Sequence, residues 1–382
     1  MNSSKILNYI WIKILKSKSA FDISRVNQES FLNNLPEPNN CKERSYAQYK
    51  CQFFFVSKWQ QLILNTIALM VIFPYLLWAY FKKCDIKVFT DAIIDTKDWN
   101  QSFVPLSIKK KFVSIREVNW KEGAFLNIND IIFLFHIVKQ HPLSGWFLLK
   151  ICIKIAKYSY IIRQYHPKAI IVHNEYSFTS SVLTDYCRKK GVSHINFMHG
   201  EKLYNIRDSF FEYDDIYIWD EHYLELFLKL RAKIVNYHIE LPPALIINES
   251  KEICQGNCFY DAKYYTAYYT ESEIKQISEI LNRIEKKGLS CCVRLHPIYS
   301  DIKLAQKYLR KEQIEDIHIN IGKSISNCCY VIGCFSTVLL QGYYANKKII
   351  LDDVVYNDIL KKLQDRDYLM LSKKHLLLSN FI

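Results

Sequence analysis

The chain has 382 residues, of which 50% are hydrophobic and 23% are charged, so global intrinsic disorder is excluded and two domains fit the length. It carries 51 Lys and Arg against 38 Asp and Glu, and the resulting net charge of +13 suggests an acidic partner such as a phosphorylated substrate, nucleic acid or an anionic membrane. The twelve cysteines form no CxxC pair, and we expect no cleavable signal peptide, which favours buried thiols in a reducing compartment.

The first notable element is an uncharged run over residues 62–81, which ends against Lys82 and Lys83. Twenty residues are just enough to cross the hydrocarbon layer of a membrane. Asn65, Thr66 and Pro74 weaken that interpretation, so a transmembrane helix, a monotopic hairpin, a helix lying on the membrane and a buried core helix all stay open.

A second segment, near residues 139–165, contains no acidic residue and carries Lys150, Lys154 and Lys157 at helical spacing. This pattern predicts a basic amphipathic helix. Because basic side chains are attracted to anionic lipid, we expect the two segments to hold a cytoplasmic protein peripherally on the inner face of the membrane.

Short β-branched runs then alternate with amphipathic helices, as a parallel sheet with crossover helices requires. One helix is expected to run through Lys190 and stop at Gly191, and another to begin at Asp220 and Glu221. The expected strands of this series are residues 169–173, 194–198 and 216–219.

A second series follows a less regular stretch near residues 240–268. Thr270 and Glu273 form a capping-box pattern for a helix that ends at Gly288. Its expected strands are residues 289–295, 330–333 and 348–351. The pattern predicts an α/β protein in two parts, residues 1–245 and 246–382.

Ligands of open α/β sheets bind beyond the carboxyl ends of the strands, so residues that follow strands are the candidates for a site. In the first half, His173 and Glu175 follow one strand, and His199 and Glu201 follow the next. We consider His199, Glu201 and Glu175 as alternative bases for a hydroxyl acceptor. Helix capping and loop hydrogen bonds are their structural alternatives.

In the second half, Gly333 is followed by Ser336 and Thr337 at the start of a helix, whose N-terminus favours a phosphate. Simple capping of the helix is the alternative. Arg294 and His296 are two residues apart on the preceding strand, and we expect both to reach the same phosphate.

Cys254 and Cys258, with His238 upstream, come nearest to a metal-binding pattern, but a fourth ligand at a usual spacing is missing. We therefore expect neither a metal nor a cofactor.

The order of MHGE (198–201), RLHP (294–297) and CFSTVLLQG (334–342) resembles bacterial surface-polysaccharide glycosyltransferases of the GT-B fold. This group includes sialyltransferases, Kdo transferases and CDP-glycerol transferases. The resemblance implies two Rossmann-like domains facing a cleft, with the acceptor on residues 1–245 and the nucleotide-sugar on residues 246–382.

By the same resemblance, His199 supplies or flanks the base and His296 contacts the phosphate or protonates the leaving group. Gln341 stands where several relatives carry an acidic residue that holds a ribose, which puts the identity of the nucleotide in doubt. The residues expected to bind the donor are Arg294, His296, Pro297, Gly333, Ser336, Thr337 and Gln341.

We therefore expect an inverting, metal-independent glycosyltransferase that moves sialic acid or a related ulosonic acid from a CMP-sugar to a lipid-linked or surface glycan of capsule, O-antigen or lipooligosaccharide. The acceptor would be carried on a polyprenyl diphosphate, with no nucleic acid as partner. A CDP-alditol phosphotransferase or a nucleotide-sugar epimerase would use the same fold. The alternative from another class is a non-enzymatic basic protein that binds a membrane or nucleic acid.

Overall fold

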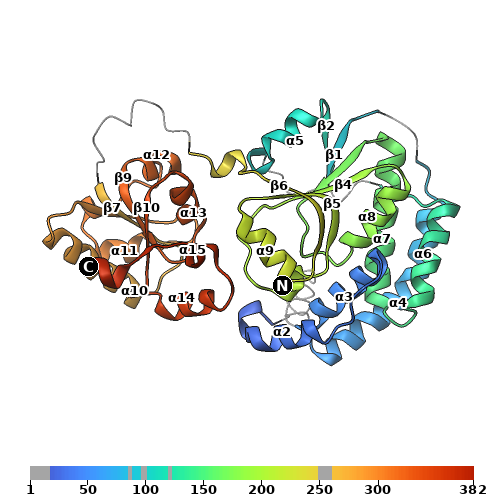
Figure 1. Cartoon of the computed structure of the whole chain (residues 1–382), viewed down its shortest axis with the longest axis horizontal. Coiled ribbons are helices and arrows are strands. Elements are labelled where there is room, and N and C mark those ends of the chain that lie inside the picture. Colours follow the sequence, from blue (N-terminus) through green and yellow to red (C-terminus); the bar gives the residue numbers. More distant parts are fainter. Residues whose placement is uncertain (1–17, 85–87, 96–100, 119–122, 248–259) are drawn as a thin grey trace, which may run out of the picture. The chain divides into compact units, whose positions relative to one another are not determined.

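The structure, a computed structural model, describes residues 18–84, 88–95, 101–118, 123–247 and 260–382 (Figure 1). By their contacts these residues form two compact units. The first unit runs up to His199 and resumes at Tyr204–Glu240, whereas the second contains Gly200–Leu203 and Leu241–Ile382. The division expected after residue 245 therefore comes after residue 240, and Gly200–Leu203, expected in the first domain, belongs to the second unit.

The described part of the first unit is built on a six-stranded sheet with the order β2-β1-β3-β4-β5-β6, and every neighbouring pair is parallel. Its strands are β1 (Ala92–Asp95), β2 (Ile115–Val118), β3 (Ala169–Val172), β4 (Ser193–Phe197), β5 (Glu212–Ile218) and β6 (Lys233–Ile239). The direction of winding changes between β1 and β3, because β2 lies on one side of β1 and the later strands lie on the other.

Helices cover both faces of this sheet: α7 (Gly145–Tyr165) and α8 (Ser180–Lys189) on one face, and α5 (Leu106–Lys111) on the other. On the first face, Tyr158 of α7 and Thr184 of α8 hydrogen-bond the His194 ring of β4. On the second face, Ile108 and its neighbours share a core with the strand residues.

Helix α7 is a core helix, and this corrects the expectation of a membrane-binding helix near residues 139–165. Lys154 and Lys157 point toward the sheet and both pair with Asp95 at the end of β1. Lys157 is only 8% exposed and Asp95 only 6%. These two lysines therefore balance a buried carboxylate and are not available to lipid, whereas Lys150 remains exposed.

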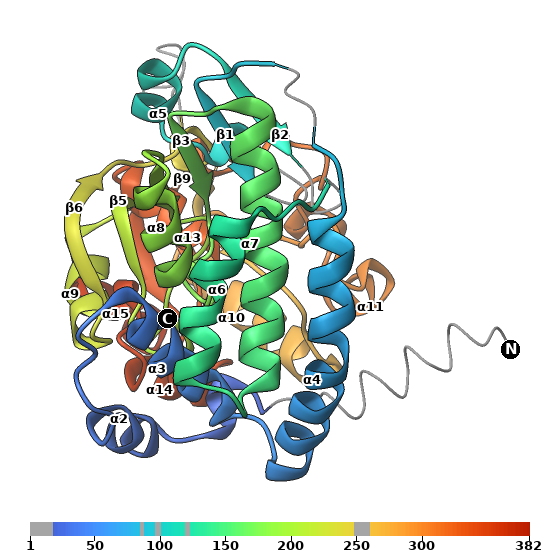
Figure 2. The same cartoon turned by 90° about the vertical axis from the view of Figure 1, so that its right-hand side faces the viewer.

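Further helices lie outside α7 and α8 (Figure 2). They are α4 (Lys58–Tyr80) and α6 (Ile128–Gln140), which both pack against α7, and α3 (Cys41–Phe53), which packs against α8. Capping boxes start two of them, at Ser57 and Gln60 for α4 and at Asn127 and Asp130 for α6. The first unit also contains α2 (Arg25–Asn33) and α9 (Glu221–Lys229).

The described part of the second unit has a five-stranded parallel sheet with the order β11-β10-β9-β7-β8. Its strands are β7 (Tyr260–Tyr265), β8 (Cys291–Arg294), β9 (Cys328–Gly333), β10 (Lys348–Leu351) and β11 (Leu376–Leu377). Here the winding changes direction between β7 and β9.

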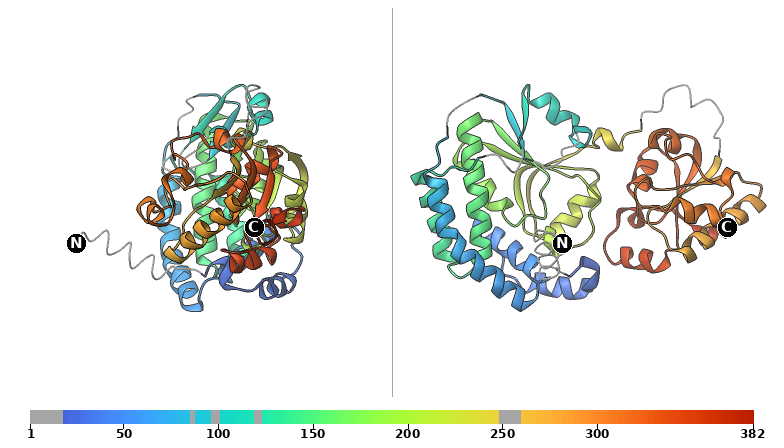
Figure 3. Two further views of the ribbon diagram at one scale, coloured as in Figure 1. Left: turned by 90° about the vertical axis from the view of Figure 1, so that its left-hand side faces the viewer. Right: turned by 180° about the vertical axis from the view of Figure 1, so that it is seen from behind.

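The helices of the second unit again cover both faces of the sheet (Figure 3). One face shares its core with α10 (Glu271–Lys286), α11 (Ile302–Tyr308) and α16 (Leu378–Phe381). On the other face lie α12 (Ile321–Ser326), which reaches Lys263 and Tyr265 of β7, and α13 (Thr337–Tyr344), whose Gly342 packs against β9 and β10. The unit also contains α14 (Asn357–Gln364) and α15 (Leu369–Ser372).

The predicted fold class is thus confirmed as α/β with two parallel sheets. Gly191 and Gly288 follow α8 and α10 with φ of 71° and 79°, a left-handed conformation that suits glycine. Asp220 caps α9, and Thr270 and Glu273 form the predicted capping box of α10.

Candidate functional site

Two histidines lie side by side at the carboxyl edge of the first sheet. His173 follows β3, His199 follows β4, and their ring centroids are 4.3 Å apart. Both rings are partly exposed. The sequence marks His173 only as one polar residue after a strand, and its contact with His199 arises because β3 and β4 are neighbours in the sheet.

Buried side chains hold the loop after β3 in place. Asn196 of β4 accepts the Asn174 N–H at 2.8 Å and donates to the Glu175 carboxylate at 3.1 Å. Tyr213 of β5 donates to the Asn174 carbonyl at 2.8 Å, and Gln48 of α3 donates to the Glu175 carbonyl at 2.8 Å. The loop that carries His173 is therefore tied to two neighbouring strands and a helix.

Glu175 is fully buried in this network. A carboxylate with no exposed surface does not reach a dissolved acceptor, so the structure assigns Glu175 to fixing the loop and corrects its inclusion among the candidate bases. His199 and Glu201 remain as candidates.

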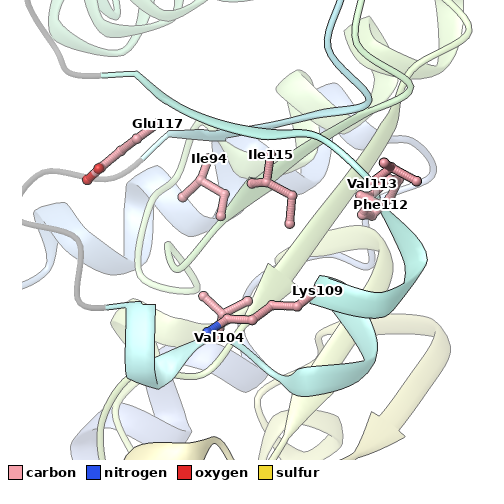
Figure 4. A pocket seen from close by; sticks show the side chains of 7 residues that line it. All are labelled: Ile94, Val104, Lys109, Phe112, Val113, Ile115 and Glu117. Carbon is pink, nitrogen blue, oxygen red and sulfur yellow. The ribbon is translucent and has the colours of Figure 1, made fainter.

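A small pocket of about 270 Å³ opens beside β1, β2 and α5 of the first unit (Figure 4). Ile94, Val104 and Ile115 form apolar walls, and Lys109 and Glu117 bring opposite charges. None of the site residues predicted from the sequence lines it. Its volume lies just below the range typical of ligand pockets, so it suits a small group.

In the second unit the change of winding between β7 and β9 marks the expected ligand position. Gly333 ends β9, and Ser336 is the N-cap of α13, where its side chain accepts the Val338 N–H at 3.2 Å. Thr337, the first residue of the helix, is exposed. Ser336 therefore caps α13, as the alternative has it, and its role toward a phosphate stays a prediction.

His296 follows β8 at the same edge of the sheet. Its Nδ1 accepts the N–H groups of Ile298 and Tyr299 at 3.1 and 3.2 Å, so the ring proton resides on Nε2. Burial lowers the pKa of His296, which keeps the ring neutral near pH 7. Its backbone N–H donates to Ser300, whose hydroxyl donates in turn to the Ala267 carbonyl after β7. The ring is thus a fixed, neutral Nε2–H donor.

Arg294 does not serve the phosphate role that we expected. Its guanidinium is buried and donates to Glu315 at 2.9 Å and to the Ile319 carbonyl at 2.6 Å. Glu315 also accepts from Lys263 and Ser324, both at 2.5 Å. Arg294 and His296 are two residues apart in the chain, but only His296 lies at the carboxyl edge of the sheet. Arg294 belongs to a buried ionic cluster with Glu315 and Lys263.

Glu201 lies on the second unit, although its chain neighbours on both sides belong to the first. Burial raises the pKa of Tyr368 far above its usual value, and the charge of Glu201 adds to this effect, whereas a hydrogen bond from the Ser336 backbone opposes it. Tyr368 packs its ring against Phe335, just before the start of α13, and lies within electrostatic range of Glu201. Nothing in the sequence around Tyr368 signals this position.

The remaining candidates of the donor motifs differ in exposure. Pro297 is exposed in the turn after His296. Gln341 donates its side-chain amide to the Ala244 carbonyl at 2.9 Å, so in this structure it fastens the segment before β7 and does not present itself to a ribose.

A larger pocket of about 600 Å³ lies beside the end of β8 and is within the range of ligand pockets. Leu295, Ile302 and Ile317 supply apolar walls, and Gln306 and Asp316 are among its polar residues. His296 follows Leu295 in the chain but is not among the residues that line the pocket.

Cys254 and Cys258 of the weak metal pattern lie outside the described residues. Among the residues that the structure describes, no three His, Cys, Asp or Glu side chains are grouped closely enough to hold a metal ion.

No protein-family profile matches the sequence, and no curated protein matches it significantly. Solved structures with a similar arrangement include S. aureus MnaA with UDP (TM-score 0.43, 10% identity, 68% of this chain and 78% of that chain) and a UDP-N-acetylglucosamine 2-epimerase (0.40, 12%, 70% and 79%). The wall teichoic acid polymerase TagF is also similar (0.40, 9%, 87% and 85%). Similarity at this level carries no information on what this chain binds.

Proposed function

We propose that the protein is a glycosyltransferase that takes a sugar from a nucleotide donor bound at the β7–β9 edge of the second unit. One observation carries the proposal: the Gly200–Leu203 segment, which holds Glu201, belongs to the second unit, and the charge of Glu201 acts on Tyr368, which packs beside the α13 start. Transfer of a sugar from a nucleotide requires two elements, a base for the acceptor hydroxyl and a group that binds the donor phosphate. This part of the second unit offers a candidate for each.

The donor side accommodates more than a lone phosphate. β8 and β9 flank β7, so His296 and the start of α13 project from strand ends about 10 Å apart. A phosphate above the end of β7, between the two, lies within reach of both. We place the donor phosphate there and its nucleoside in the 600 Å³ pocket beside Leu295.

The reaction balances without a further reactant. The acceptor oxygen forms a bond to the anomeric carbon as the bond from that carbon to the phosphate oxygen breaks. The acceptor proton passes to His199 or Glu201, and the nucleotide leaves as an anion. Hydrogen bonds from His296 and from the first turn of α13 stabilise the charge that develops on the departing phosphate.

For the donor we take a CMP-linked sialic or related ulosonic acid first and a CDP-alditol second, because the motif order of MHGE, RLHP and CFSTVLLQG supports both. The acceptor we propose is a glycan carried on a polyprenyl diphosphate. Transfer of a sugar adds no phosphorus to the acceptor, whereas transfer of an alditol phosphate does. The mass and phosphorus content of the product therefore separate the two, and conversion of the donor without any acceptor would indicate an epimerase.

Melting curves with CMP, CDP, UDP and GDP test nucleotide binding first. A nucleotide at 100 times its Kd adds about 2.7 kcal/mol of stability, which raises the Tm by about 5 °C or more. Gln306→Trp narrows the pocket from an exposed position and should weaken binding at least tenfold. Lys307→Trp, next to it on α11 but outside the pocket, is the matched control. If no nucleotide shifts the Tm of the wild-type protein, the proposed function is wrong.

Transfer assays then assign the base. Glu201→Gln and His199→Gln are compared with Glu221→Gln, an exposed glutamate at the start of α9. We expect loss of the base to lower kcat about 100-fold or more and to leave the nucleotide Kd within threefold. The acid limb of the pH profile distinguishes the two groups, since carboxylates ordinarily titrate near pH 4 and imidazoles near pH 6.5. Full activity in both variants would refute a base in this turn.

A further inference from the structure

Helix α4 exposes a continuous apolar surface along its whole length. It is the one described helix whose length and composition would allow it to cross a membrane, yet only 17% of its most apolar window is buried. A core helix of the same composition would be mostly covered. Its exposed large apolar residues, with Phe81 just beyond its end, are Trp59, Leu62, Ile63, Ile67, Leu69, Met70, Val71, Phe73, Leu77, Trp78, Tyr80 and Phe81.

The opposite side of α4 is held by a narrow seam against the protein. Leu64, Ala68 and Ala79 are its buried residues, spaced so that they share one stripe of the helix. Small residues at this seam let the helices approach closely. At Gly145, the first residue of α7, an added Cβ would collide with the Asn65 carbonyl oxygen.

Hydrogen bonds fasten both ends of this seam. Near the start of α4, the Asn65 side chain accepts the Trp146 N–H at 3.0 Å and the Tyr49 hydroxyl at 3.2 Å. Near its end, the Ala79 carbonyl accepts the Leu126 N–H at 3.2 Å. Helix α4 is therefore fixed along the outside of the first unit, with a defined face turned away from it (Figure 2).

The attachment to α7 excludes a membrane-spanning position for α4 in this fold. The other side of α7 packs on the sheet, where Lys154 and Lys157 surround Asp95. A spanning α4 would either break the seam or draw these charges into hydrocarbon, and charged side chains there are costly. A helix lying in the plane of the membrane meets neither obstacle.

The composition of the surface favours lipid over a second copy of the chain. Residues 58–83 contain no acidic residue, and Lys58, Lys82 and Lys83 flank the apolar run. Trp59 and Trp78 lie near the two ends, where aromatic rings favour the boundary between headgroups and acyl chains. Lys82 lies 5.0 Å from the ring centroid of Trp78. Further exposed apolar residues lie on α6, at Ile132 and Phe135, and on α7, at Ile153.

We propose that α4 is an interfacial helix that docks the first unit on an anionic membrane, with its apolar face in the headgroup and acyl boundary and its lysines at the headgroups. This surface is independent of the nucleotide site. Failure of the membrane proposal and failure of the proposed function can therefore be told apart, because vesicle binding requires no nucleotide donor.

The test is flotation of the full-length protein with vesicles of phosphatidylcholine alone and of phosphatidylcholine mixed equally with phosphatidylglycerol. Met70 and Phe73 are 65% and 68% exposed, so Met70→Glu with Phe73→Glu leaves the seam intact. We expect this variant to lose at least about 100-fold in partitioning, since two large apolar groups are replaced by charges. Val26→Glu with Leu228→Glu, exposed on α2 and α9, is the matched control and should stay within threefold of the wild type.

Two further measurements address the other occupants of this surface. Light scattering after size exclusion reports self-association. If the wild type is a dimer and only the Met70→Glu, Phe73→Glu variant is a monomer, the occupant of this surface is a second copy of the chain and not a membrane. Met70→Trp adds a fluorophore at the middle of α4, and in the difference from the wild-type signal, quenching by lipids brominated near the headgroup should exceed quenching by lipids brominated near the chain end. The reverse order would indicate a spanning helix, and unchanged vesicle binding by the glutamate variant would equally overturn the proposal.

Discussion

Replacement of Glu315 by Gln should destabilise the second unit severely, and because Glu315 also lines the 600 Å³ pocket, stability and nucleotide affinity are measured separately. Glu315 is the carboxylate between two buried cations: Lys263 donates to it at 2.5 Å and Arg294 at 2.9 Å. Burial by itself would raise the pKa of Glu315, but hydrogen bonds from Lys263, Ser324 and Arg294 outweigh it, and the pKa lies below its ordinary value. The charge is therefore present at neutral pH and fully engaged.

The magnitude follows from the charge balance of the cluster. Two cations and one anion leave a net charge of +1, and Glu315→Gln raises it to +2 with no counter-charge. Breaking a buried ion pair in this way costs about 3–5 kcal/mol. Arg294→Met instead leaves the neutral pair of Lys263 and Glu315 and removes the donations to Glu315 and to the Ile319 carbonyl, so we expect about 1–3 kcal/mol.

Urea unfolding followed by far-UV circular dichroism measures both variants. All seven tryptophans precede residue 220, so their fluorescence reports on the first unit and serves as an internal reference. Nucleotide affinity is then measured on the folded variants at low temperature. If Arg294→Met keeps its unfolding free energy within about 0.5 kcal/mol of the wild type but loses nucleotide affinity tenfold, the guanidinium contacts the ligand and the buried cluster is the wrong account.

Six further variants probe other parts of the chain. His296→Asn keeps an oxygen that accepts the N–H groups of the turn but loses the Nε2–H, so we expect turnover to fall about 100-fold with the Tm unchanged. His296→Ala should lower both turnover and Tm. Equal Tm values for the two variants would refute the role of His296 in holding the turn. Thr337→Ala should weaken nucleotide binding without loss of stability, and Ser336→Ala should also cost about 1 kcal/mol of unfolding free energy in the same melts, as expected for a cap. Asp95→Asn should cost about 3–5 kcal/mol by denaturant unfolding, because it leaves a buried lysine unbalanced. Burial lowers the pKa of His194 to about 3, so below pH 6.5 the unfolded chain binds a proton that the folded chain does not. The free energy of unfolding should therefore fall by about 2 kcal/mol from pH 6.5 to 5. Urea unfolding of His194→Gln at the same pH values should not show this fall.

Local patterns in the sequence predicted some of the residues of the candidate site. The residues after β4, β8 and β9 were predictable, because a β-branched run that ends in polar residues marks the edge of a parallel sheet wherever it occurs. The partners of these residues were not. Tyr368 reaches the start of α13 from a segment without a recognisable pattern, and His173 meets His199 only because the sheet places β3 beside β4.

The sequence by itself determined the α/β class, the strands from β3 to β5 and from β8 to β10, the caps of α9 and α10, and the apolar length of α4. These features depend on periodicity and capping within a few residues, which act through local backbone geometry. The edge strands β2 and β6 escaped prediction because half or more of their residues are exposed and no apolar run marks them.

Only the tertiary structure decided which way the charged side chains face. Lys154 and Lys157 resemble a basic helix face, and Arg294 resembles a phosphate ligand, yet each turns inward to a carboxylate that is distant in sequence. Helix spacing cannot tell a solvent face from a core face when the counter-charge comes from another element. The same holds for α4, whose composition suits a core, a span or a surface, and whose exposed face is set by the close seam that Gly145 of α7 allows.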